Sequence, residues 1–570
     1  MDHSTPALFI TILIASQAPA LAQSTPWIVK GERGVVAADC PHASQVGADI
    51  LRAGGNAIDA ATAVSFALSV TRPQSTGVGG GGFLIARFAD GRVFVQDFRE
   101  TAPAAATANM FVRAAERSPQ GASPAVYGHL AVGVPGLVAG RCQALALHGT
   151  MPLDKVIAPA VKLARDGFPI DQHYVESAAE IRKVYESHPE LKETCGYVWR
   201  THLADGRPRN VGETLVQPQL ARLLETIARE GPEGFYRGPV AQAIAEEMRR
   251  HGGLITEQDL ADYRVKSREP LRFRYRDFSF IAMPPPSSGG VALAEALHVL
   301  EALDFQGVVA RDPGLAWHYQ VEAFKHAFAD RARWLGDADF VPIPLSWLMS
   351  EVYARELAAN INPFDISDTN SYGAIQLPND GGTSHFSIVD RLGNVVVSTE
   401  SVNTEFGSLA AIEEWGLVLN NTMDDFVTDP RRPNAYGLVQ SMRNAVAPGK
   451  RPLSSMVPTI ILQDDKPYLM LGASGGPRII TSVLDVLLNV LDRGFSLEQA
   501  MAHARPHHQW QPDEVFFDAE PPAPLMSALA SRGHQLTSKR KTGIVQAILR
   551  IDNGWIAASD PRKGGRPAAE

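Results

Sequence analysis

The chain has 570 residues, of which 45% are hydrophobic and 20% are charged, a composition typical of a soluble globular protein and not of a disordered or collagen-like one. Its 53 Lys and Arg residues are outnumbered by 62 Asp and Glu residues, and the net charge of −9 gives no electrostatic reason to bind nucleic acid, so small molecules are the expected partners. Three widely spaced cysteines, Cys40, Cys142 and Cys195, indicate neither a disulfide framework nor a zinc ribbon.

The first residues are predicted to form a secretory signal. The apolar run 7–16 is too short to span a bilayer, and it leads to Ala20 and Ala22, which are spaced as at a signal-peptidase site. The residues before this run carry no Lys or Arg, unlike most such signals, and a disordered tail is the alternative. We expect a signal peptide over residues 1–22 and a periplasmic or secreted mature chain without a membrane span, since no later apolar run reaches about 18 residues.

A glycine-rich run at 77–82 follows two predicted helices, 42–53 and 57–70. The run satisfies the dinucleotide-binding pattern, but it leads into a strand where that pattern requires a helix, and no Lys-Ser/Thr pair follows it. We therefore interpret these glycines as positions of close backbone packing.

Two hairpins are predicted far apart in the sequence, one from strands 83–88 and 93–98 and the other from strands 386–390 and 395–399. The segment between them is predicted to be mainly helical, and a further strand pair surrounds residues 464–466. Helices are expected at 153–166, 216–229, 240–251, 290–303, 314–335 and 478–491. The pattern indicates an α+β fold with largely antiparallel sheets, divided at Thr383 after the turn-rich stretch 361–382.

One candidate nucleophile is Ser474, in the G-x-S-x-G sequence 472–476 between an apolar strand and a helix. A nucleophile elbow belongs to a mainly parallel sheet, whereas this sequence predicts hairpins, so a serine hydrolase is disfavoured. Gly475 and Gly476 fit better as a turn whose backbone N–H groups stabilise an oxyanion.

The second candidate is Thr383, a hydroxyl residue at the start of a strand and directly after Gly382. Cleavage before Thr383 would give its hydroxyl a base, the new α-amine, whose unperturbed pKa of about 7.7 to 8.0 suits neutral pH. From the spacing alone, a loop that enters a hairpin is the simpler interpretation.

A series of short motifs decides between these interpretations. In the second half they are 383–390 (TSHFSIVD), 398–407 (STESVNTEFG), 419–426 (LNNTMDDF), 434–439 (NAYGLV), 450–456 (KRPLSSM), 472–478 (GASGGPR), 507–510 (HHQW) and 558–562 (ASDPR); in the first half they are 54–61 (GGNAIDAA), the glycine run before Phe83, and 97–100 (DFRE). In order and spacing they resemble the γ-glutamyltransferases over nearly the whole chain after the signal. Many ordered motifs make this resemblance specific where a single one would not.

The resemblance implies a four-layer αββα sandwich of the N-terminal-nucleophile hydrolase type. It further implies a precursor that cuts itself between Gly382 and Thr383 into a large subunit, 23–382, and a small subunit, 383–570, which form a heterodimer. Thr383 would then take the γ-glutamyl group from a donor such as glutathione and pass it to water or to an amino acid or peptide. Ser401 would orient Thr383, and Gly475 and Gly476 would hold the oxyanion.

The resemblance also suggests how the substrate is held. Arg99, with Ser454 and Ser455, would bind the carboxylate of the γ-glutamyl group, because a guanidinium fork matches a carboxylate. Asp425 and Asn403 would bind the ammonium, and Tyr436 would belong to a loop that covers the site. Without the resemblance, Arg99 would be interpreted as a surface ion-pair residue and Ser454 and Ser455 as caps of a loop.

Thr422 departs from the family pattern, which has Gln or Glu in contact with the ammonium. A shorter side chain weakens this contact and could admit glutaryl-type acyl groups, as in the related cephalosporin acylases. Ser384 and Ser401 are milder departures.

No cofactor and no metal are expected. His503, His507 and His508 lack an HExxH pattern and an acidic residue at a matching distance, so we interpret them as structural. Besides the acylase, the alternatives left open are a serine hydrolase that uses Ser474 and a non-catalytic periplasmic binding protein. The latter would keep an intact chain.

Overall fold

The computed structural model describes residues 25–368, 382–428, 434–438, 440–537 and 539–570. The predicted signal peptide and most of the predicted break, residues 369–381, lie outside the described residues. Among the described helices, none is both long and apolar enough to cross a bilayer.

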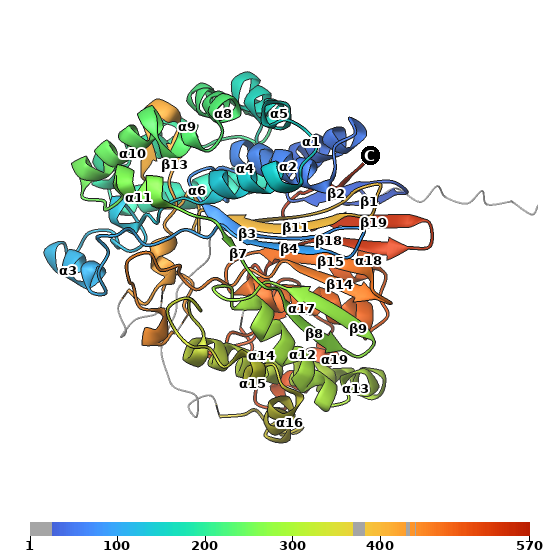
Figure 1. The fold of residues 1–570 in the computed structure, drawn as a ribbon. Coiled ribbons are helices and arrows are strands. Elements are labelled where there is room, and N and C mark those ends of the chain that lie inside the picture. The colour runs from blue at the N-terminus through green and yellow to red at the C-terminus, as the bar shows by residue number, and fades with distance from the viewer. Residues whose placement is uncertain (1–24, 369–381, 429–433, 439, 538) are drawn as a thin grey trace, which may run out of the picture.

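Two seven-stranded antiparallel sheets pack face to face at the centre of the molecule (Figure 1). In the first, the strand order is β1 (Ile28–Gly31), β19 (Gly554–Ser559), β18 (Ile544–Ile551), β15 (Lys466–Ser474), β14 (Thr459–Gln463), β9 (Phe278–Ala282) and β8 (Leu271–Tyr275). In the second it is β20 (Ala568–Ala569), β2 (Val35–Ala38), β10 (Ser384–Val389), β11 (Val395–Ser401), β3 (Gly81–Arg87), β4 (Val93–Asp97) and β7 (Lys266–Ser267). Each sheet therefore contains strands from before and from after Thr383.

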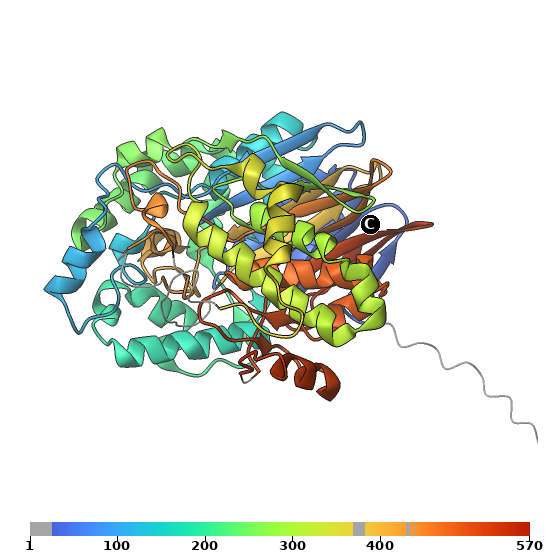
Figure 2. The ribbon, with the colours of Figure 1, turned by 90° about the horizontal axis from the view of Figure 1, so that it is seen from below.

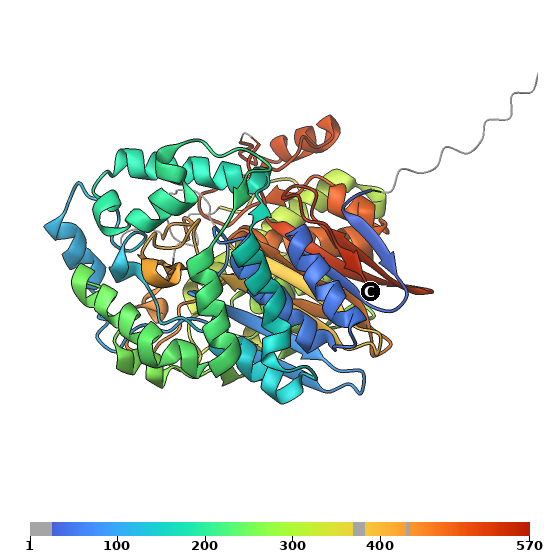
Figure 3. The same cartoon turned by 90° about the horizontal axis from the view of Figure 1, so that it is seen from above.

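Helices cover the outer face of each sheet. Over the second sheet, seen from above in Figure 3, lie α1 (Pro41–Arg52), α2 (Ala57–Thr71), α4 (Leu137–His148) and α5 (Leu153–Asp166). Under the first sheet, seen from below in Figure 2, lie α12 (Gly289–Ala302), α13 (Phe305–Arg311), α14 (Pro313–Trp334), α15 (Leu345–Leu348), α16 (Glu351–Ala359), α17 (Arg478–Leu491), α18 (Leu497–Ala502) and α19 (Ala523–Ala530). The order helix, sheet, sheet, helix confirms the predicted αββα sandwich.

A helical extension flanks the sandwich on one side (Figure 1). It contains α3 (Met110–Arg117), α6 (Gln172–Ser187), α7 (Leu191–Thr194), α8 (Pro218–Glu230), α9 (Glu233–Tyr236), α10 (Gly238–His251) and α11 (Glu257–Asp262). Three two-stranded pairings complete the described strands: β5 (Phe168–Pro169) with β6 (Thr214–Leu215), β12 (Ala411–Ile412) with β13 (Leu417–Val418), and β16 (Pro506–His507) with β17 (Phe516–Phe517).

Local sequence explains the helices that position the sheets. Asn56 caps α2 by accepting the N–H groups of Ile58 and Asp59. Every residue of α2 is buried because the helix packs against the second sheet and is enclosed by α1, α4 and α5. Asp312 caps α14 in the same way, and Pro313 occupies the first turn, where its missing N–H costs nothing.

Apolar residues of both sheets and of α12, α14 and α17 form one large core cluster. A second cluster joins α1 and α2 to the outer face of the second sheet. Burial of this apolar surface supplies most of the driving force for folding, at about 25 cal/mol per Å². The strand ends that carry the predicted site residues are thus anchored in a packed interior.

Candidate active site

Thr383 lies directly before β10, at the centre of the second sheet, with 4% of its surface exposed. Its Oγ1 is 3.2 Å from Oγ of Ser401, the last residue of the neighbouring strand β11. Ser401 Oγ donates to the carbonyl oxygen of Gly382 at 2.6 Å and accepts the N–H of Asn403 at 2.7 Å. The single hydroxyl proton of Ser401 is used in the hydrogen bond to the Gly382 carbonyl oxygen. The Thr383 hydroxyl must therefore be the donor in its hydrogen bond with Ser401. The predicted nucleophile is thus linked to the carbonyl of the bond predicted to be cut.

A buried lysine that the sequence analysis missed also contacts Thr383. Lys563 Nζ donates to the Thr383 carbonyl at 3.0 Å and pairs with Asp39 Oδ2 at 2.6 Å. The ammonium further lies 3.4 Å from Ser75 Oγ and 3.5 Å from Ser474 Oγ. Lys563 therefore connects residues from both halves of the chain at the nucleophile.

Gly475 and Gly476 form the turn between β15 and α17, as predicted. Their φ values of +125° and +58° are ones that L side chains rarely adopt. Within the described part of the chain, neither backbone N–H has a protein acceptor. A Cβ on Gly476 would lie 2.5 Å from the Tyr436 ring, so this turn must remain glycine.

The predicted carboxylate and ammonium ligands pair with each other. Arg99, which follows β4, forms a buried ion pair through Nη2 with Asp425 Oδ2, and its Nε donates to the Pro452 carbonyl at 3.4 Å. Burial raises the pKa of Asp425, while the Arg99 charge opposes that increase. Each partner could thus bind one charged end of an amino acid head group.

Asn403 and Tyr436 contact each other, and Asn434 connects their part of the chain to Asp425. The Tyr436 hydroxyl donates to the Asn403 carbonyl at 2.5 Å, and Asn403 Nδ2 donates to the Asn421 carbonyl at 3.1 Å, so the Asn403 side-chain oxygen is left to accept other donors. Asn434 Nδ2 donates to Asp425 Oδ1 at 3.3 Å and connects the segment 434–438 to the ion pair.

Thr422 lies at the start of the 3₁₀ turn Thr422–Asp425 and is fully buried. Its hydroxyl donates to Glu100 Oε1 at 2.8 Å. Burial raises the pKa of Glu100, and Glu100 Oε2 lacks a hydrogen-bond donor among the described residues while lying 3.5 Å from Arg99 Nη1. The departure at Thr422 is thus accommodated by a buried carboxyl group that the sequence analysis did not single out.

Ser454 and Ser455 come shortly after Pro452, whose carbonyl accepts a hydrogen bond from Arg99, but their own hydroxyl groups bond to other residues. Ser454 Oγ accepts the N–H of Met456 at 3.1 Å, and Ser455 Oγ accepts from Arg331 Nη2 at 3.5 Å. Burial lowers the pKa of Arg331 to about 10, and the nearby Asp425 opposes this shift. Arg331 is a second buried cation beside the predicted carboxylate ligands. No pattern in the sequence indicates its role beyond its place in a predicted helix.

The serine-hydrolase alternative finds little geometric support. Ser474 Oγ has one hydrogen bond within the described residues, from Lys563 Nζ, and none from a histidine. The three histidines bond to separate partners: His503 to the Ala504 carbonyl, His507 to Thr481 and Gln509, and His508 to Asp513.

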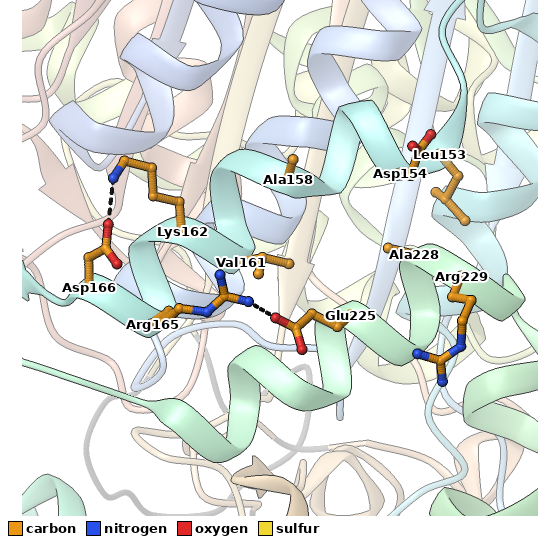
Figure 4. Close-up of a pocket in the computed structure, with 10 residues that line it drawn as sticks. All are labelled: Leu153, Asp154, Ala158, Val161, Lys162, Arg165, Asp166, Glu225, Ala228 and Arg229. Carbon is orange, nitrogen blue, oxygen red and sulfur yellow. Dashed lines mark hydrogen bonds and ion pairs between the residues drawn. The ribbon is translucent and has the colours of Figure 1, made fainter.

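An open groove of about 840 Å³ lies away from these residues, between α5 and α8 (Figure 4). Its lining alternates in charge: Lys162 pairs with Asp166, and Arg165 pairs with Glu225. None of the predicted site residues lines it.

Known proteins resemble the chain over nearly its full length. A family model described as gamma-glutamyltranspeptidase matches residues 43–570. The glutathione hydrolase proenzyme of Escherichia coli (strain K12) is 42% identical over 541 residues, which cover 94% of this chain and 91% of that protein. An acylase ACY 1 proenzyme of Pseudomonas sp. (strain SE83) is 36% identical, with 95% and 94% covered. The crystal structure of a cephalosporin acylase from Bacillus halodurans superposes with a TM-score of 0.83 at 28% identity, covering 98% of this chain and 99% of that one.

Proposed function

Because this chain belongs to the gamma-glutamyltranspeptidase family, we propose that it is a self-cleaving enzyme that transfers γ-glutamyl groups from glutathione and related compounds to water, amino acids or peptides. The observation that carries the proposal is the hydrogen-bonded chain from Thr383 through Ser401 to the Gly382 carbonyl. The E. coli relative bears the name proenzyme, which supports processing of a precursor.

In the precursor, Thr383 Oγ attacks the carbonyl carbon of Gly382. The Ser401 hydrogen bond to the Gly382 oxygen stabilises the charge that develops there. The hydroxyl proton of Thr383 passes to its peptide nitrogen as the Gly382–Thr383 amide bond breaks, which leaves an ester between Gly382 and Thr383 Oγ. Water then hydrolyses that ester. The products are a large chain that ends at Gly382 and a small chain that begins with a free α-amine on Thr383.

In the mature enzyme, the Thr383 α-amine takes the hydroxyl proton while Oγ attacks the γ-carbonyl of the donor. The N–H groups of Gly475 and Gly476 stabilise the oxyanion, and the proton passes to the leaving amine. Water or an acceptor amine then releases the γ-glutamyl group from the ester. No step requires a metal or a cofactor.

The Arg99–Asp425 pair selects the donor. On binding, the substrate carboxylate takes the place of Asp425 at the Arg99 guanidinium, with Ser454 and Ser455 alongside, while the ammonium takes the place of Arg99 at Asp425 and reaches Asn403. The ion pair between Arg99 and Asp425 is thus replaced by two ion pairs with the substrate, so each buried charge keeps a partner of opposite charge. Tyr436 covers this region and limits the access of water.

The mature enzyme is then a heterodimer of residues 23–382 and 383–570 in the periplasm or outside the cell, after removal of residues 1–22. The signal-like N-terminus supports this location.

The test is intact mass and N-terminal sequencing of the purified protein, followed by release of p-nitroaniline from its γ-glutamyl and glutaryl anilides. We expect two chains, the smaller beginning at Thr383, with activity on the γ-glutamyl anilide. Thr383→Ala is expected to remain a single inactive chain, whereas Thr383→Ser should still be cut. An active Thr383→Ala variant would refute the proposal, and loss of activity in Ser474→Ala alone would favour the serine hydrolase.

A glutaryl acylase is the second candidate, favoured by Thr422 and by the acylase relatives. Cleavage at Thr383 together with activity on the glutaryl anilide alone would establish it.

A further inference from the structure

A cluster of two histidines and a glutamate lies outside the active site, under the first sheet. His318 and Glu322 are four residues apart on α14 and therefore share a face of the helix. His534 follows α19, which packs against α14. All three side chains are buried, and one ligand atom from each lies within 4.8 Å of the other two.

The hydrogen bonds of His318 fix its protonation. Nε2 lies 2.8 Å from the Asn362 carbonyl oxygen, which can only accept, so Nε2 carries the proton. The lone pair of His318 Nδ1 therefore points at His534 Nε2, 2.8 Å away. A ring whose far N–H donates to a backbone carbonyl is the usual arrangement of a metal-bound histidine.

Glu322 completes the cluster with a carboxylate. Its Oε2 accepts the N–H of Ser367 at 3.0 Å, and its Oε1 lies 2.8 Å from Lys325 Nζ. Neither Oε1 nor that ammonium has a well-oriented hydrogen bond among the described residues, so the contact is a charge pairing only. Lys325 also lies 3.7 Å from Asp513 Oδ1, a second carboxylate that can retain it.

We propose that His318 Nδ1, His534 Nε2 and one oxygen of Glu322 bind a transition-metal ion, with Zn²⁺ the best match to two imidazoles and a carboxylate. Zinc–nitrogen bonds of about 2.0 to 2.1 Å in tetrahedral geometry require the two nitrogen atoms to separate by about 0.5 Å. His534 moves its ring proton from Nε2 to Nδ1, so both imidazoles stay neutral. Water fills the fourth position.

The ion would connect three segments of the chain: α14, the loop that carries Asn362 and Ser367, and the turn after α19. It has no part in the chemistry at Thr383, so the proposal stands or falls independently of the proposed function. The competing explanation is an N–H···N hydrogen bond between the two rings with no ion bound.

The experiment uses the full chain, treated with EDTA and dialysed, with Zn²⁺ as the probe. We expect calorimetry and metal analysis to find one Zn²⁺ per chain, and the thermal midpoint to rise with Zn²⁺ concentration because the ion binds the folded state. His534→Gln and His318→Asn should lose this site. His503→Gln, a histidine outside the cluster, is the matched control and should keep it. A wild-type chain that binds no zinc, or variants that bind it unchanged, would overturn the proposal.

A second variant keeps the test decisive if the histidine variants do not fold. Lys325→Met removes the ammonium that competes for Glu322, so its zinc affinity should increase at least tenfold over the wild type. An unchanged affinity in Lys325→Met would contradict Glu322 as a ligand.

Discussion

Lys563 Nζ donates a hydrogen bond to the carbonyl oxygen of Thr383 at 3.0 Å, while the same ammonium pairs with Asp39 at 2.6 Å. This lysine fixes the backbone of the proposed nucleophile to the other half of the chain. It also places a positive charge next to the α-amine that cleavage would create.

Lys563→Met is expected to slow cleavage of the precursor by about 10- to 100-fold, because a charge-assisted hydrogen bond of about 1.5 to 3 kcal/mol holds Thr383 in position. The time course of the full-length band on denaturing gels measures this. In any mature enzyme that forms, the acid limb of the kcat/KM profile should move to higher pH, since a nearby cation disfavours protonation of the α-amine.

The control for Lys563→Met is the double variant with Asp39→Asn. It removes the buried carboxylate that the single variant leaves unpaired, so stability should recover while cleavage stays slow. Wild-type cleavage in the single variant would show that Lys563 does not position Thr383.

Gly476→Ala is expected to reduce kcat by about 10²- to 10³-fold, because a Cβ there displaces Tyr436 and misaligns an oxyanion donor. Cleavage of the precursor should be less affected, since Ser401 and not this turn contacts the Gly382 oxygen. Gly449→Ala is the matched control: its φ is +70°, yet its Cβ would meet no atom within 4 Å. Equal losses in both variants would point to backbone strain alone.

Thr422→Val should lower the free energy of unfolding by about 1 to 3 kcal/mol, because Glu100 loses its donor in a buried environment. Thr422→Ser keeps the hydroxyl and should stay near the wild type; urea denaturation measures both. The Thr422 hydroxyl donates its proton to Glu100, so the oxygen lone pairs of Thr422 can accept a hydrogen bond from the substrate ammonium. The Val variant lacks this acceptor, so its ratio of γ-glutamyl to glutaryl anilide activity should fall. An unchanged ratio would remove Thr422 from the substrate site.

The buried carboxyl group of Asp424 makes the stability of the folded chain depend on pH. Burial raises its pKa to about 8, the neighbouring Asp425 adds to the shift, and the N–H of Ala435 at 2.8 Å opposes it. Between about pH 4 and pH 8 the folded chain keeps a proton that the unfolded chain has released, so this group lowers stability as pH rises through that window. Asp424→Asn should remove this loss. The stability gain of the variant over the wild type, measured by urea midpoints, should therefore be larger at pH 8 than at pH 5. A difference that is the same at both values would contradict the raised pKa.

Local sequence predicted the elements well because each depends on near neighbours. The helices 153–166 and 478–491 match α5 and α17 in full, and both predicted hairpins form. The sequence could not show that β10 and β11 lie between β2 and β3, because strand alternation indicates a buried face but not the partner strand.

Motif resemblance predicted part of the arrangement of the candidate site, whose residue roles stay predictions. Thr383 and Ser401 lie together, as do Arg99 and Asp425. Lys563 and Arg331 were missed because a lysine in a turn-rich tail and an arginine in a helix are usually solvated, and only the tertiary fold buries them. Likewise, no sequence pattern indicates that His534 lies beside His318 and Glu322, because only the packing of α19 against α14 brings them together.

The mixing of strands from both halves of the chain within each sheet has a consequence for assembly. Five strand pairings join residues before Thr383 to residues after it: β1 with β19, β2 with β10, β2 with β20, β3 with β11, and β9 with β14. Two separately synthesised halves would each present unpaired edges, which favour aggregation over docking. If the chain is cut before Thr383, as we propose, the uncut chain would serve as the template for both polypeptides. These pairings would then have to form before the cut, which would be the last step of assembly.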